Sequence, residues 1–220
     1  MRELNMEERV KKLLEKHKDD KDLTSEMDYI ELGWDWSEAD LTGWNLEGLK
    51  LSTYDEKANF KNVFMVAANL KGVIFEGANL ERATLGSSIL ENADFNNANL
   101  EGADFEGSDL KKSLFYRANL KKADFRGADL KDTNFMDSNL YKTILGGTNL
   151  QNAILTKCNL QEAYLGGANL ENVDLHGSNL RDADFSEDTK LHNVNLFKCK
   201  IENSNLKFAF NQIDDKVIQE

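Results

Sequence analysis

The stretch ANLEGADFEGSDL, residues 98–110, repeats a five-residue unit almost three times. Each unit (ANLEG, ADFEG and the beginning of the next, SDL) holds a small residue, then Asn or Asp, then Leu or Phe, then two variable residues. The same unit continues in both directions along the chain. Because an internal repeat of fixed period is the signature of a solenoid, this unit decides the fold class.

The repeat keeps one register from residue 58 to residue 185. All 26 positions taken in steps of five from Phe60 to Phe185 are Leu, Phe or Met, and the 26 positions two residues earlier, from Ala58 to Ala183, are all Ala, Ser, Thr, Val or Cys. A period of five suits neither a helix, around which every fifth residue drifts, nor a long strand, whose side chains alternate. It predicts a short extended piece and a bend, with the large and the small residue inward and the other three positions facing water.

The two variable positions are predicted to form the bends, because the second of them is often a residue that tolerates a positive φ. The residues of this kind at that position are Gly72, Gly77, Gly102, Gly107, Gly127, Gly147, Gly167 and Gly177, together with Asn62, Asn92, Asn97, Asn152 and Asn172.

This pattern resembles the pentapeptide repeat family. Members of that family fold as a right-handed quadrilateral β-helix with four pentapeptides per coil, so the resemblance implies an all-β solenoid of this kind. Residues 20 apart would then stack at the strand spacing of about 4.8 Å. An interior aromatic ladder would follow from Phe75, Phe95, Phe115 and Phe135.

The five-residue step extends past both ends of the regular region. Upstream it includes Trp36, Leu41, Leu46 and Leu51, and downstream it includes Leu191, Leu196, Ile201 and Leu206. Residues 52–58 lie in a nine-residue step and are predicted to be a bulge or a loop, and one extra residue follows Phe185. We expect a β-helix of about eight coils over residues 36–206, roughly 40 Å long, with an N-terminal helical cap over 1–35 and a C-terminal cap or tail over 207–220.

The open ends of a solenoid need cover. Residues 6–18 place Val10, Leu13, Leu14 and His17 on one helical face, and Asn5 with Glu8 resembles a capping box, so we predict a capping α-helix. A partner-binding helix is the alternative. The tail carries Phe208, Phe210, Ile213, Val217 and Ile218, which would cover the other end or form a dimer contact. The chain would accordingly be a monomer or a homodimer through its C-terminal end.

Catalysis has little support in the sequence. His17, His176 and His192 have no metal-ligand spacing to one another or to cysteine, and neither a phosphate-binding glycine motif nor a nucleophile elbow occurs. Cys158 and Cys199 fall in the small inward position and are interpreted as core residues, with a reactive thiol as the alternative. We expect no catalytic residue, no cofactor and no metal, and the enzyme hypothesis would need a cofactor or metal in the purified protein.

The composition is that of an acidic protein with no prolines and a formal net charge of −12, which disfavours direct nucleic-acid binding. The first residues lack the apolar segment of a signal peptide, and no apolar run is long enough to span a membrane. A cytoplasmic location is the default expectation.

Charge is distributed unevenly along the chain. Residues 36–110 carry 13 acids and 5 bases, whereas residues 111–145 carry 8 bases and 4 acids. The candidate interaction surface consists of Glu81, Glu101, Lys111, Lys121, Lys122, Arg126 and Lys131, with Arg117 in the same basic belt. Glu81 and Glu101 would stack with a like-charge cost. The simplest interpretation of this charge distribution is a solvated surface that only prevents self-association.

The first functional hypothesis is a non-catalytic scaffold for an unidentified protein partner. The second comes from the family resemblance, since some pentapeptide repeat proteins mimic DNA and bind DNA gyrase or topoisomerase IV. Residues 36–110 would carry about one net charge per 2 Å, close to the roughly 1.7 Å of duplex DNA, but the basic belt interrupts the acidic path.

Overall fold

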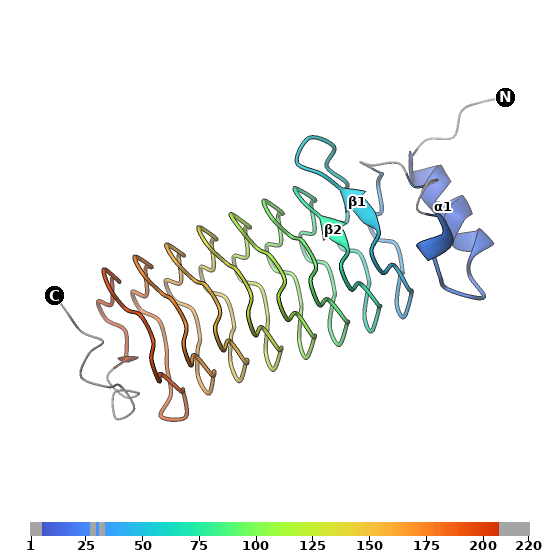
Figure 1. Cartoon of the computed structure of the whole chain (residues 1–220). Helices are drawn as coiled ribbons and strands as arrows, with labels where there is room; N and C mark the ends of the chain where they lie inside the picture. The colour runs from blue at the N-terminus through green and yellow to red at the C-terminus, as the bar shows by residue number, and fades with distance from the viewer. Residues whose placement is uncertain (1–5, 27–29, 31–33, 207–220) are drawn as a thin grey trace.

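The computed structural model describes residues 6–26, 30 and 34–206. In Figure 1 these residues form one row of stacked coils, with helix α1 (Met6–Lys16) at the N-terminal end. The chain is an all-β solenoid, as the repeat predicted, and it is the right-handed quadrilateral β-helix that the family resemblance implied. The capping-box residue Asn5 and the tail from 207 to 220 lie outside the described residues.

Each coil contains four pentapeptides. Parallel bridges join Asn99 to Asn119 and Asp104 to Asp124, and the same 20-residue spacing holds along the regular region. The outward residue between the small and the large one lies on one of four faces. We name these face A, which carries Asn99, face B, which carries Asp104, face C, which carries Asp109, and face D, which carries Leu114.

The unit 103–107 shows why each pentapeptide has its composition, because all five of its backbone N–H groups find an acceptor. Asp104 donates to the preceding coil at 2.9 Å, and Phe105 and Gly107 donate to the following coil at 2.7 and 2.9 Å. The N–H of Ala103 closes the turn before it at 3.0 Å. The side chain of Asp104 accepts the N–H of Glu106 at 2.9 Å, so the Asn or Asp of the repeat satisfies the one donor of the unit that no backbone carbonyl accepts.

Every turn of the regular region has a positive φ at its second variable residue. The glycines and asparagines predicted for this role adopt it, as Gly127 (φ 66°) and Asn97 (φ 58°) illustrate. Charged residues adopt it as well, among them Lys122 (φ 59°) and Asp132 (φ 60°). The turn is therefore imposed by the stacking of coils even where the local residue disfavours a left-handed conformation.

The interior is filled by the large residues of the repeat, and those from Phe60 to Phe185 are at most 3% exposed. The predicted Phe ladder is present on face D, where consecutive rings from Phe75 to Phe135 stack at 5.4, 5.0 and 4.7 Å between centroids. A second ladder joins Phe105 to Phe125 on face B at 4.7 Å. The two ladders meet edge to face across the interior, with centroids about 6 Å apart.

The two irregular steps of the repeat, around residues 52–58 and after Phe185, form different structures. Residues 53–57 form a projecting loop beside strand β1 (Lys50–Ser52), which pairs in parallel with β2 (Ile74–Phe75); Figure 1 shows the loop rising above the row of coils. The coil spacing there is 24 residues, as between Asp35 and Asn59. The extra residue after Phe185 enlarges a turn and raises the spacing to 21, as between Asn169 and Lys190.

The N-terminal end is closed by helix α1 and by large aromatic residues. Val10 and Leu13 are each 3% exposed, Leu14 packs against the core, and His17 follows the helix with Nε2 2.8 Å from Glu26 in the 3-10 helix η1 (Thr24–Glu26). Asp22 pairs with Asn45, and Leu23 is fully buried. The stacking therefore begins one strand earlier than the five-residue register indicated.

Candidate interaction surface

Glu81 and Glu101 lie in one row at the corner between faces A and B. The row also contains Lys61 and Lys121, one at each end of the acidic pair. Lys61 forms an ion pair with Glu81 at 3.1 Å, and Lys121 forms one with Glu101 at 3.2 Å. Glu81 and Glu101 therefore lie in adjacent coils of one row, as expected, and each carboxylate also has a cation on its other side.

Lys111 and Lys131 stack at the corner between faces C and D, diagonally across the coil. The ammonium group of Lys111 lies 3.0 Å from Asp109 and 3.2 Å from Asp129. These hydrogen-bonded carboxylates raise the pKa of Lys111. Lys111 therefore bridges Asp109 of its own coil and Asp129 of the following coil, whereas Lys131 forms no ion pair within the described part of the chain.

Arg126 lies at a third corner, between faces B and C. It contacts Asp124 at 2.6 Å and Glu106 of the preceding coil at 3.3 Å, and the hydrogen bond that its guanidinium donates to Asp124 raises the pKa of Arg126. Lys122 follows Lys121 at the corner between faces A and B. The seven candidate residues are therefore spread over three corners, and the structure does not bring them into one patch.

Face A carries a feature that the sequence interpretation missed. Its outward residue is Asn in seven consecutive coils, and each Asn Nδ2 donates to the Oδ1 of the preceding one at 2.9–3.3 Å. The first, Asn59, donates to Asp35 at 2.9 Å. The members of this Asn ladder are Asn59, Asn79, Asn99, Asn119, Asn139, Asn159 and Asn179. Asn at 20-residue spacing was the sequence signal that would have revealed it.

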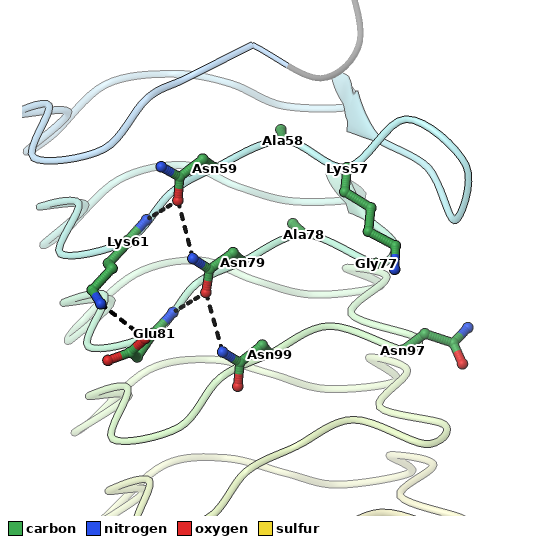
Figure 2. Close-up of a pocket in the computed structure, with 10 residues that line it drawn as sticks. All are labelled: Lys57, Ala58, Asn59, Lys61, Gly77, Ala78, Asn79, Glu81, Asn97 and Asn99. Atoms are coloured by element: carbon green, nitrogen blue, oxygen red, sulfur yellow. Dashed lines mark hydrogen bonds and ion pairs between the residues drawn. The ribbon is translucent and has the colours of Figure 1, made fainter.

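An open groove lies on face A where the projecting loop meets the Asn ladder. Its volume is about 460 Å³, and Figure 2 shows Asn59, Asn79 and Asn99 along its floor. Lys57, at the end of the loop, borders one side, and the ion pair of Lys61 with Glu81 borders the other (Figure 2). The loop, the Asn ladder and the charges of the corner converge in this groove.

Neither cysteine has the environment of a reactive thiol. Burial raises the pKa of Cys158 to about 12 and that of Cys199 to about 11. Cys158 is 2% exposed and its Sγ lies 3.4 Å from the hydroxyl of Ser138. This agrees with their interpretation as core residues.

In residues 6–26, 30 and 34–206, no group of three or more His, Cys, Asp or Glu side chains is placed to hold a metal ion. The helices within these ranges include none with the length and apolar character needed to cross a bilayer.

Comparison with protein families decides the identity of the fold. Models described as pentapeptide repeats match residues 56–86 and 78–116, and a pentapeptide repeat region model matches residues 108–185. Together they span residues 56–185, more than half of the chain. The chain belongs to the pentapeptide repeat family. Comparison with curated proteins gave no match.

Solved pentapeptide repeat proteins have similar structures. Full-length QnrB1, described as a plasmid-mediated fluoroquinolone resistance protein, is 20% identical over 84% of this chain and 91% of its own, with a TM-score of 0.54. HetL from Nostoc sp. strain PCC 7120, described as involved in the regulation of heterocyst differentiation, is 22% identical over 93% of this chain and 96% of its own, with a TM-score of 0.45. At 20% identity the likeness to QnrB1 shows the shared fold.

Proposed function

We propose that this pentapeptide repeat protein is a non-catalytic scaffold that binds a protein partner through the outward side chains of its solenoid. The observation that carries the proposal is that different positions of each repeat form the core and the surface. The small and large positions and the backbone are used up by the core and by the coil-to-coil hydrogen bonds, whereas the two corner positions vary freely in charge and size. A fold of this kind offers a long surface whose chemistry can change without loss of the scaffold.

Within the candidate surface, we assign the main role to Lys122 and Lys131. Five of the seven residues, namely Glu81, Glu101, Lys111, Lys121 and Arg126, form ion pairs with the solenoid itself. A partner protein gains little binding free energy from a side chain that is already in an ion pair, since exchange of one surface ion pair for another is close to neutral. Lys122 and Lys131 are the two of the seven candidate residues that form no ion pair within the described chain.

The test is capture of cross-linked partners by the intact protein and by a Lys122→Asn, Lys131→Gln variant. Asn is chosen at 122 because it tolerates the positive φ of that position. We expect a specific protein partner with the unaltered chain and a weaker yield with the variant, although both melt alike. A Glu81→Gln, Glu101→Gln variant serves as the matched control, and equal capture by all three proteins would contradict the assignment.

An effector of DNA gyrase or topoisomerase IV is the second candidate function. It is favoured by the net charge of −8 over residues 36–110 and by the structural likeness to QnrB1, a fluoroquinolone resistance protein. The basic belt over residues 111–145 interrupts that acidic surface, and this candidate is therefore placed second. Gyrase supercoiling of relaxed plasmid, with and without a quinolone, tests it: inhibition or protection at micromolar protein supports this candidate, and no effect at tens of micromolar removes it.

A further inference from the structure

The Asn ladder leaves face A with spare hydrogen-bond donors and few spare acceptors. The Oδ1 of Asn79 accepts Nδ2 of Asn99 at 3.1 Å and the backbone N–H of Glu81 at 3.3 Å, which occupies both of its lone pairs. Its Nδ2 has two hydrogens, and the ladder uses one, in the bond to Asn59. Asn59 and Asn99 have the same arrangement, so each coil presents one N–H that needs an acceptor.

The residues that line the groove at the N-terminal end of this ladder carry a formal net charge of +1 in an acidic protein. The charged residues that line it are Lys57, Lys61 and Glu81, and Lys61 is already paired with Glu81. Lys57 is exposed, its ammonium group lies 5.3 Å from the centre of the Tyr54 ring, and it forms no ion pair within the described chain. An anionic group is the natural complement of a cation and amide donors in one place.

The shape of the groove suits a short extended segment. Its volume of about 460 Å³ lies within the roughly 300–1,000 Å³ of typical ligand sites, and it is open along the solenoid. Asn97 borders it on the same side as Lys57 (Figure 2), and its side chain has no hydrogen-bond partner within the described residues. Donors therefore line the groove along the floor and along the side of Lys57.

We propose that this groove binds an extended, carboxylate-bearing peptide segment of a partner protein. The peptide carbonyls would accept from the spare amide N–H groups of the Asn ladder, and an Asp or Glu side chain would pair with Lys57. A polyanion such as DNA is disfavoured, because it would extend beyond the groove over a protein of net charge −12. The inference rests on the proposed scaffold function and names the partner chemistry for one surface.

The chain supplies a matched control for Lys57. Lys157 lies in the same corner row, five coils further along, beside Asn159 of the same ladder but far from the loop. Asn97 has a similar control, because Asp137 occupies the same row with the same φ of 58°. Asn97→Asp therefore adds a negative charge to the groove at a position where the fold accepts aspartate.

The test measures the fluorescence anisotropy of labelled acetyl-Glu-Ser-Glu-Ser-Glu-Ser-Glu-Ser-amide at low ionic strength. We expect Lys57→Gln to raise its Kd by about two- to fivefold, the range of a surface ion pair, and Asn97→Asp to raise it further. Lys157→Gln should leave the Kd unchanged, and the corresponding Gln-Ser peptide should bind more weakly than the Glu-Ser peptide.

Three outcomes would overturn the proposal: no binding of the acidic peptide at millimolar concentration, equal effects of the Lys57 and Lys157 substitutions, or binding of a short DNA duplex in its place. None of these affects the scaffold function itself, which depends on capture of a partner and on Lys122 and Lys131. Conversely, if no partner protein is captured but the acidic peptide still binds, the scaffold function is contradicted while the groove proposal stands.

Discussion

At the residue scale, the backbone conformation of the turns determines which substitutions the surface accepts. Lys122 has a φ of 59° and Gly127 a φ of 66°, and a Cβ added to Gly127 would meet nothing within 4 Å. A side chain at such a position costs about 1–2 kcal/mol through the backbone alone. The turns that hold a residue other than glycine at this position therefore hold conformational strain that the coil-to-coil hydrogen bonds outweigh.

This strain predicts opposite effects at two neighbouring turns. Lys122→Gly should stabilise the protein by about 0.5–1 kcal/mol, because relief of the left-handed conformation exceeds the added entropy of the unfolded chain. Gly127→Ala should destabilise it by about 1–2 kcal/mol. Urea unfolding measures both, and a loss of stability in the Lys122 variant would contradict the argument.

The paired glycines have a role beyond the turn. The ring of Tyr164 lies against the corner, so that a Cβ on Gly166 would be 2.3 Å from its hydroxyl oxygen and one on Gly146 would be 2.7 Å from its Cε1. Gly147 and Gly167 have a positive φ, whereas Gly146 and Gly166 do not. The first glycine of each pair is thus present for the contact with Tyr164, and only the second is required by the turn.

A double-mutant cycle tests this contact. Gly166→Ala should destabilise the protein that has Tyr164, because the ring must move off the corner. In a Tyr164→Ser background the same substitution should stabilise it by about 0.4–1 kcal/mol, because alanine restricts the unfolded chain. The same sign in both backgrounds would show that the ring does not constrain the glycine.

At the scale of the single coil, the inward residues are the least replaceable. Leu110 is fully buried, Ala118 is 1% exposed, and Glu101 is an outward residue paired with Lys121. The interior is narrow because two Phe ladders meet across it about 6 Å apart. A change of charge or of volume inside one coil therefore affects the coils on both sides.

Three substitutions in adjacent coils should differ accordingly. Leu110→Asp should destabilise by at least about 4 kcal/mol, since it buries a charge in an apolar interior. Ala118→Leu should cost about 1–3 kcal/mol through overpacking, and Glu101→Gln less than about 1 kcal/mol. Thermal melting separates the three, and similar melting temperatures would refute the inward and outward assignment.

At the scale of the whole molecule, ion pairs between coils run along the solenoid. Hydrogen bonds from neighbouring side chains lower the pKa values of three carboxyl groups: Lys71 acts on Glu91, Tyr141 and Lys142 act on Glu162, and Arg181 acts on Glu202. A carboxylate whose pKa is lower in the folded state stabilises that state above its unfolded pKa. The contribution disappears as the pH falls through the folded pKa.

The melting temperature should therefore fall as the pH is lowered from about 5 to 3, the window that begins at the ordinary glutamate pKa near 4.3. A Glu91→Gln, Glu162→Gln, Glu202→Gln variant should melt lower at neutral pH and lose part of this pH dependence. Calorimetry of both proteins over this range is the measurement. A melting temperature that rises with acidification would show that relief of the net negative charge dominates instead.

The five-residue pattern by itself determined the solenoid, the inward rows and the turns, because every coil repeats the same packing requirement at the same position. The resemblance to the family added the four-sided coil, and the Phe ladder of face D followed from it. What lies around residues 52–58 was left open between a bulge and a loop, since a nine-residue step is compatible with either.

The tertiary structure decided which outward residues meet. Glu101 forms an ion pair with Lys121, and Lys111 with Asp129, only because the coil is 20 residues long, so residues distant in sequence become neighbours in space. The Asn ladder and the groove beside Lys57 arise in the same way, from stacking and from the loop that the 24-residue coil projects. The core can be predicted from the local sequence repeat because its packing is the same in every unit. The contacts between surface side chains depend instead on the number of residues per coil and on one insertion.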